Sequence, residues 1–245
     1  MKESRFFYAP NAIEHDELPD TEAAHALRVL RLKEGDEIFL IDGKGAFHRA
    51  LVSMTSSKHC FYNIQETLPQ NPLWRGNIHL ALAPTKNMDR MEWLAEKATE
   101  IGINELSFLN SQFSERKVVK NERIEKIVVS AVKQSRKAWM PVIHEMTNFD
   151  SFVRSPHKGV CCIAHCYDEI PKEDLFLLLS SKNDECQDIV MMIGPEGDFS
   201  IKEVAFAMDN GFHSVSLGDC RLRTETAALY AVAIAQLTRR CNTAP

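Results

Sequence analysis

The 245-residue sequence has no apolar run approaching the ~20 residues of a membrane-spanning helix, so we expect no membrane segment. The first residues, 1–8, are too polar for a secretory signal peptide. The seven cysteines include no C-x-x-C pair, which argues against a disulfide framework or a zinc ribbon. We interpret Cys161, Cys162 and Cys166 as buried thiols. These absences predict a soluble, reduced, cytoplasmic protein that binds no metal.

Motifs of several common enzyme classes are also missing. No G-x-G-x-x-G follows a strand, so a Rossmann cofactor site is not indicated, and there is no Walker A, G-x-S-x-G or H-E-x-x-H motif. Positive charge is scarce as well, with a net charge of −5 and a pI near 6.0, whereas nucleic-acid-binding domains are more often basic.

One segment departs from this acidic balance. Eight basic residues lie between positions 114 and 139, against three acidic ones: Arg116, Lys117, Lys120, Arg123, Lys126, Lys133, Arg136 and Lys137 against Glu115, Glu122 and Glu125. A solvated helix face explains such a segment as well as a phosphate-binding surface does. Both interpretations stay open at this point.

Strand and helix patterns divide the chain into domains at 1–72 and 73–245. The first contains a short amphipathic helix and four strand-like runs, at 21–32 and at 5–8, 37–41, 46–54 and 60–68, which suggest a small β-barrel. In the second, apolar strands alternate with helices, which predicts a parallel α/β sheet. The strands are expected at 78–82, 105–109, 160–164, 189–193 and 214–217, and the helices at 88–101, 121–138, 149–153, 174–179, after 200 and at 224–240.

The last quarter of the chain carries the sharpest pattern. A continuous apolar run, 189–193, predicts a strand buried on both faces, and the loop 194–197 breaks it. Ser200 and Glu203 have the spacing of a capping box and so begin a helix. A second strand, at 214–217, ends in an arginine-containing loop before the final helix. Two loops thus leave the carboxyl ends of parallel strands, where open α/β sheets bind ligands.

The sequences of these loops, GPEGDFS (194–200) and LGDCRLRTETA (217–227), resemble the two signature motifs of the RsmE family. Members of that family are S-adenosylmethionine-dependent methyltransferases of the SPOUT superfamily, and they methylate N3 of a uridine in 16S ribosomal RNA. Asp198 stands where the family usually has glycine. This departure concerns the backbone conformation at 198, which Asp tolerates better than most residues if it is left-handed.

The resemblance implies a C-terminal trefoil knot, an N-terminal PUA-like RNA-binding domain, a homodimer, and the small ribosomal subunit as partner. It also implies that S-adenosylmethionine is held by the two loops. The residues carried over for this role are Met192, Ile193, Gly194, Pro195, Glu196, Gly197, Leu217, Gly218, Arg221, Leu222, Arg223 and Thr224.

Catalytic and RNA-contacting roles follow from the same resemblance, and for Lys120 and Arg123 from the basic segment between 114 and 139. Arg223 is expected at the uracil, where guanidinium donors can stabilise a forming anion. Glu225 is either a base or a plain helix-start carboxylate, and Arg116 is a further candidate for contact with the substrate. The expected RNA contacts are Arg5, Arg28, Arg31, Lys120, Arg123, Gln134 and Arg136.

Two other functions remain possible from the sequence. One is a different SPOUT methyltransferase, acting on tRNA or on a ribose 2′-hydroxyl. The other is an RNA-binding module without catalytic activity, for which Asp198 is the only indication.

Overall fold

The computed structural model describes residues 5–182 and 188–242, the last two without their side chains. Residues 1–4 of the polar N-terminal segment and Cys186 lie outside the described residues. The chain divides into two compact units, Met1–Leu73 with Val129–Met140, and Trp74–Val128 with Pro141–Pro245. Residues 129–140, which the sequence pattern grouped with the second domain, therefore belong to the first unit.

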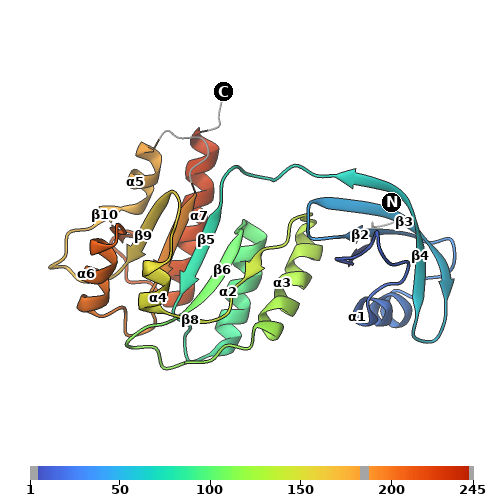
Figure 1. The fold of residues 1–245 in the computed structure, drawn as a ribbon, viewed down its shortest axis with the longest axis horizontal. Helices are drawn as coiled ribbons and strands as arrows, with labels where there is room; N and C mark the ends of the chain where they lie inside the picture. The colour runs from blue at the N-terminus through green and yellow to red at the C-terminus, as the bar shows by residue number, and fades with distance from the viewer. Residues whose placement is uncertain (1–4, 183–187, 243–245) are drawn as a thin grey trace. The chain divides into compact units, whose positions relative to one another are not determined.

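The smaller unit is built on a four-stranded sheet in the order β1-β2-β3-β4 (Figure 1). The strands are β1 (Phe6–Tyr8), β2 (Glu37–Ile41), β3 (Ala46–Thr55) and β4 (Cys60–Pro69). β1 runs parallel to β2, and the other neighbours are antiparallel. Asp42 stabilises the β2–β3 turn because its carboxylate accepts the backbone N–H groups of Lys44 and Ala46. Alternate residues of β3 are buried, as in a sheet with one solvated face.

The helix expected at 21–32 is shorter and changes type along its length. α1 (Asp20–Ala24) continues into a π-helical segment, η1 (His25–Val29). Arg31 then adopts a left-handed φ of 52°, which ends the helical segment. π-helical turns are frequent at functional sites, and this one presents Arg28 as an exposed side chain.

The larger unit contains a parallel sheet in the order β10-β12-β9-β11-β5-β6-β7, with β8 paired to β6 (Figure 1). Its longer strands are β5 (Ile78–Leu82), β6 (Glu105–Asn110), β9 (Val160–Ala164), β11 (Ile189–Ile193) and β12 (His213–Ser216). These lie within one residue of the expected positions, and the α/β class is confirmed. The two-residue strands β7 (Val142–Ile143), β8 (Thr147–Asn148) and β10 (Glu173–Asp174) are too short to show a periodic pattern.

Helices cover both faces of this sheet (Figure 1). On one face, α7 (Thr224–Asn242) packs on α2 (Met88–Ile101) and α5 (Leu175–Ser181), and on the other α4 (Phe149–Arg154) packs on α6 (Ile201–Asp209). Successive side chains of a strand point to opposite faces, so the residues of β11 alternate between the two layers. Every residue of β11 is buried, as the apolar run predicted.

The helix boundaries follow local hydrogen bonds. At the start of α6, Ser200 Oγ accepts the Glu203 N–H while Glu203 Oε2 accepts the Ser200 N–H, so the expected capping box is confirmed. The helix expected at 121–138 ends earlier: α3 is Asn121–Ser135. The reason is Arg136, whose left-handed φ of 51° cannot continue a right-handed helix.

In the described part of the chain, no helix combines the length and the apolarity that crossing a membrane would require. The described cysteines are free thiols, but their burial differs from the expectation at one position. Cys162 is buried and Cys161 half-buried, whereas Cys166 is exposed. Cys166 lies two residues beyond the end of β9, where the buried part of the sheet has ended.

Candidate active site

A cavity opens at the carboxyl edge of the parallel sheet. β9, β11 and β12 end there, and the segments that follow them enclose a volume of about 1040 Å³. Small-molecule sites are typically about 300–1,000 Å³, and in open α/β sheets they lie at this edge. The lining residues come from α2 (Arg90), from 164–172, from the loop 193–198 and from the loop 215–227.

The loop after β11 depends on the glycine with which it starts. A Cβ atom on Gly194 would lie 2.9 Å from the backbone nitrogen of Phe199 and 3.0 Å from the carbonyl carbon of Asp198. Backbone atoms cannot move aside as a flexible side chain can, so the loop can fold back on itself only because residue 194 has no side chain.

Asp198 adopts the left-handed conformation, with a φ of 64°, in which glycine is usual. Its carboxylate compensates for the strain with two hydrogen bonds: Oδ2 accepts the Cys166 N–H at 2.8 Å, and Oδ1 accepts the Phe199 N–H at 2.7 Å. The first bond ties the loop after β11 to the segment after β9, so Asp198 holds two walls of the cavity together. The departure from the usual glycine thus leaves the loop conformation intact.

The loop after β12 presents two arginines to the cavity. Gly218 takes a φ of 101°, and its N–H is accepted by Ser216 Oγ at 3.1 Å, which sets the turn. Arg221 and Arg223 follow as exposed side chains that line the cavity. α7 begins at Thr224, directly after Arg223. Both guanidinium groups can therefore donate hydrogen bonds to a ligand in the cavity.

Glu225 is buried in the cavity wall, with 8% of its surface exposed. Its Oε1 lies 3.3 Å from Arg90 Nη1, and its buried Oε2 has no hydrogen-bond partner among the described residues. Sequence reasoning missed Arg90. A signal was present, because an arginine in the first turn of α2 opposes the helix dipole, which favours acidic residues there.

Most of the residues expected to hold a cofactor line this cavity. They are Ile193, Gly194, Pro195, Glu196, Leu217, Gly218, Arg221, Leu222, Arg223 and Thr224. Met192 and Gly197 do not. Met192 is fully buried in the layer under α4 and α6, since its side chain points to that face of β11. A Cβ on Gly197 would instead approach Phe113 at 3.3 Å.

Arg116 lies outside the cavity lining and is joined to it through Lys86. Its Nη2 donates to the carbonyl oxygen of Lys86 at 2.6 Å, and the Lys86 N–H donates to Glu196 Oε1 at 3.1 Å. Arg116 and Glu196 thus support the segment after β5 from two sides. In this structure Glu196 is both a lining residue and a structural acceptor.

His165, which the sequence did not single out, also lines the cavity. Burial lowers the pKa of His165 below its usual value, so the ring is neutral near pH 7. Its Nε2 lies 2.8 Å from Ser214 Oγ, and its Nδ1 accepts the Tyr167 N–H at 3.3 Å. Both ring nitrogens are engaged, so a proton taken up at His165 Nδ1 would break its hydrogen bond with the Tyr167 N–H.

The expected RNA-contacting residues of the smaller unit lie on its surface. Arg5 Nη1 is 3.6 Å from Asp36 Oδ2, and the guanidinium of Arg136 lies 5.4 Å above the centroid of the Phe6 ring. The remaining residues of this set, Arg28, Arg31 and Gln134, are exposed. Their charged and amide groups are accessible to a phosphate or a base.

In the larger unit, Lys120 and Arg123 differ in their surroundings. Arg123 Nη2 is 3.5 Å from Asp89 Oδ1, and Arg123 Nε pairs with Glu92, so its charge is offset by two carboxylates of α2. Lys120 is exposed, and no ion pair to it appears among the described residues. Lys120 is therefore the better placed of the two to meet a phosphate.

Comparison with known proteins identifies the family. A sequence model described as an RNA methyltransferase domain matches residues 71–236, which is more than half of the chain. The chain belongs to this RNA methyltransferase family. A second model, described as an RNA methyltransferase PUA domain, matches residues 18–64. That match gives the chain an N-terminal PUA-like domain, which includes Arg28 and Arg31.

Relatives agree with the RsmE resemblance of the two loops. Ribosomal RNA small subunit methyltransferase E of Rickettsia conorii is 28% identical over 97% of this chain and 96% of its own. The crystal structure of a probable rRNA-methyltransferase from Porphyromonas gingivalis is 41% identical, with a TM-score of 0.89 over 97% of this chain and 99% of that one. The crystal structure of ribosomal RNA small subunit methyltransferase E from Neisseria gonorrhoeae, bound to S-adenosyl methionine, is 28% identical. Its TM-score is 0.83, over 96% of this chain and 98% of that one.

Proposed function

We propose that this member of the RsmE family transfers a methyl group from S-adenosylmethionine to N3 of a uridine in 16S ribosomal RNA. The observation that carries the proposal is the cavity at the carboxyl edge of the sheet, which the two signature loops enclose together. Two of the named relatives are small-subunit rRNA methyltransferases, and one of these was solved with the same cofactor. An rRNA substrate is consistent with a cytoplasmic location.

The residues of the cavity fit this cofactor. Ile193, Leu217 and Leu222 supply apolar surface for the adenine, and the loop backbones supply donors and acceptors for its edge. The cofactor is positively charged at sulfur, and the lining contains several carboxylates: Asp168, Glu196, Asp198, Asp219 and Glu225. When bound, S-adenosylmethionine supplies a methyl group that is activated for transfer by the sulfonium.

Arg223 is assigned to the uracil. Loss of the N3 proton leaves negative charge on the two uracil carbonyl oxygens, and a guanidinium held beside them stabilises it. Arginine remains protonated in proteins, so Arg223 donates hydrogen bonds and does not accept the proton. Its exposure at the cavity mouth allows a nucleotide to reach it.

Glu225 is assigned as the acceptor of the N3 proton. Its Oε2 is buried and has no partner among the described residues, so a lone pair is available in the cavity wall. Arg90, whose Nη1 lies 3.3 Å from the other oxygen, holds the carboxylate in place. The pair thereby gives the cavity a positioned base beside the proposed uracil site.

We extend the proposal to three finer features of the fold: a C-terminal trefoil knot, a barrel-like N-terminal sheet and a homodimer. Support for the dimer comes from α7, part of whose apolar surface is exposed. Tyr230 and Leu237 are 50% and 51% exposed and lie seven residues apart, on one face of the helix. An exposed apolar stripe of this kind is suited to a subunit interface.

The test is methyl transfer from labelled S-adenosylmethionine to small ribosomal subunits that lack the modification, followed by digestion of the RNA. Labelled 3-methyluridine is the expected product. Label in another nucleoside, or in tRNA, would assign the protein to a different SPOUT methyltransferase class. RNA binding without any affinity for the cofactor would instead identify a non-catalytic RNA-binding module.

A salt titration of RNA binding distinguishes the contributions of Lys120 and Arg123. Lys120→Ala is expected to weaken RNA binding and to lower the slope of log K against log [salt] by about one, because one phosphate contact is lost. Arg123→Ala is expected to change the slope less, since Asp89 and Glu92 already offset its charge. Fluorescence anisotropy with a labelled RNA measures both. Equal slopes in wild type and Lys120→Ala would show that Lys120 is a solvated surface residue that contacts no phosphate.

A further inference from the structure

Three side chains of types that commonly bind metal ions converge at the edge of the parallel sheet opposite to the cavity. His79 is the second residue of β5, Glu105 is the first residue of β6, and His144 directly follows β7. β5, β6 and β7 are parallel, with His79 paired to Glu105 and Glu105 to Val142, so the amino ends of the three strands lie side by side. The cluster is therefore separate from the proposed methyl-transfer site.

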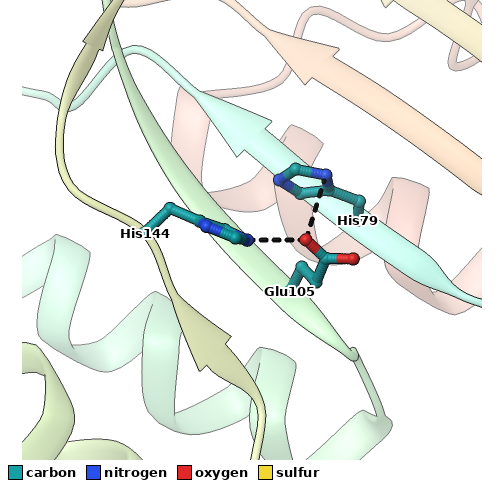
Figure 2. Close-up of side chains that lie close together, drawn as sticks. All are labelled: His79, Glu105 and His144. Atoms are coloured by element: carbon teal, nitrogen blue, oxygen red, sulfur yellow. Dashed lines mark hydrogen bonds and ion pairs between the residues drawn. The ribbon is translucent and has the colours of Figure 1, made fainter. Parts of the chain in front are cut away.

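The side chains point toward one another (Figure 2). Glu105 Oε2 is 2.6 Å from His144 Nε2 and 3.7 Å from His79 Nδ1. One donor atom from each residue can be chosen so that all three lie within 4.8 Å of one another. Two ligands on a tetrahedral Zn²⁺ are about 3.4 Å apart, since each bond is about 2.1 Å. The observed separations bracket that value, so small side-chain rotations would bring all three atoms into the coordination sphere.

The contact between His79 and Glu105 is not explained by a hydrogen bond. At 3.7 Å the two atoms are too far apart for one, whichever ring nitrogen carries the proton. The other ring nitrogen, Nε2, lies 2.8 Å from Ser107 Oγ, in hydrogen-bond range. If Nε2 donates to Ser107, the Nδ1 lone pair faces a carboxylate, which is repulsive unless a cation lies between them.

The donor set suits a divalent metal ion, because two imidazole nitrogens and one carboxylate oxygen are common ligands of Zn²⁺ in proteins.

Neighbouring groups fix the ligands as they do around known metal sites. Ser107 orients the His79 ring, and the Asn77 amide donates to Glu105 Oε1, which leaves Oε2 directed at the histidines. The cluster lines a cavity of about 700 Å³, and the His144 side chain is 39% exposed. An ion can thus enter from solvent, and water or another donor can complete its coordination.

We propose that His79, Glu105 and His144 form a binding site for a divalent transition-metal ion, with Zn²⁺ the best match to two imidazoles and one carboxylate. The ion ties the segment after β7 to β5 and β6 and stabilises the amino edge of the sheet. This proposal revises the expectation of no metal that the sequence supported. It does not depend on the proposed methyl transfer.

The test titrates Zn²⁺ into the full-length, chelator-treated protein by calorimetry, alongside His144→Ala and Glu105→Gln. Wild type is expected to bind one ion and to gain several degrees in Tm, because the ion binds the folded state only. Each variant is expected to bind at least about tenfold more weakly. Glu105→Gln keeps the shape of the side chain and covers the case in which His144→Ala fails to fold.

The matched control is His213→Ala. His213 Nδ1 lies 3.0 Å from Glu173 Oε1, so it forms a similar histidine–carboxylate pair, but the metal-ligand cluster does not include it. Its Zn²⁺ affinity should equal that of wild type. Absorption of the Co²⁺-loaded protein tests the ligands directly, and bands of a nitrogen- and oxygen-ligated ion without thiolate charge transfer are expected. Three results would overturn the proposal: failure of wild type to bind Zn²⁺, wild-type Zn²⁺ affinity in both ligand variants, or thiolate bands in the Co²⁺ spectrum.

Discussion

Replacing Arg223 with alanine is expected to lower the rate of methyl transfer about 10²- to 10³-fold, the usual cost of removing one donor to a developing anion. The affinity for S-adenosylmethionine should change by no more than about threefold, because the proposed role of Arg223 is at the uracil. Single-turnover transfer to unmodified small subunits measures the first quantity, and calorimetry with the cofactor alone measures the second.

Two further variants control this experiment. Arg223→Lys keeps the positive charge but loses the planar fork of donors, so its rate should lie between those of wild type and Arg223→Ala. Arg154→Ala removes an arginine of α4 whose guanidinium lies 5.2 Å over the Phe206 ring, away from the cavity, and its rate should equal that of wild type. A loss of cofactor affinity as large as the loss of rate in Arg223→Ala would show that the residue binds the cofactor instead.

Much of the larger unit could be predicted because its signals are local. The apolar run of β11 and the Ser200–Glu203 capping box act over a few residues, so the pattern predicts the element. The end of α3 could not be predicted in this way. Nothing in the type of Arg136 requires a left-handed backbone, and its φ is set by the surrounding fold.

In the candidate site, too, local features could be predicted from the sequence, and contacts between distant segments could not. The two loops could be found because each follows a strand and carries a continuous motif. The position of Arg90 in the first turn of α2 is unusual for an arginine, but the sequence could not show that it reaches Glu225, which lies on a helix far away in the chain. The same holds for His79, Glu105 and His144, whose positions in the chain have no metal-ligand spacing and meet only through strand order.

Met192 and Asp198 show how far the role of each single residue can be inferred from a motif. Both lie in or beside the first signature loop, but the pleat of β11 turns Met192 into the core. Asp198 adopts the left-handed backbone conformation in which glycine is usual, and its carboxylate accepts a hydrogen bond from the Cys166 N–H. The motif therefore predicts the course of the backbone better than it predicts which side chains reach the cavity.

Replacing Gly194 with alanine is expected to weaken S-adenosylmethionine binding at least about tenfold. The added methyl group would lie 2.9 Å from Phe199 N and 3.0 Å from the carbonyl carbon of Asp198. Both are backbone atoms, so the loop itself must move, and with it the N–H and C=O groups proposed to hold the cofactor. Displacements of about 1 Å in a positioning element can cost about 100-fold in rate, so methyl transfer should fall further than affinity does.

Gly211→Ala separates this local effect from a general loss of stability. Gly211 lies in the turn before β12 with a φ of 89° and open space around its Cβ position. Alanine there is strained by about 1–2 kcal/mol, which lowers the Tm without altering the cavity. The expected result is a lower Tm with unchanged cofactor affinity for Gly211→Ala, and a loss of affinity for Gly194→Ala. Equal cofactor affinities in the two variants would mean that the loop after β11 does not hold the cofactor.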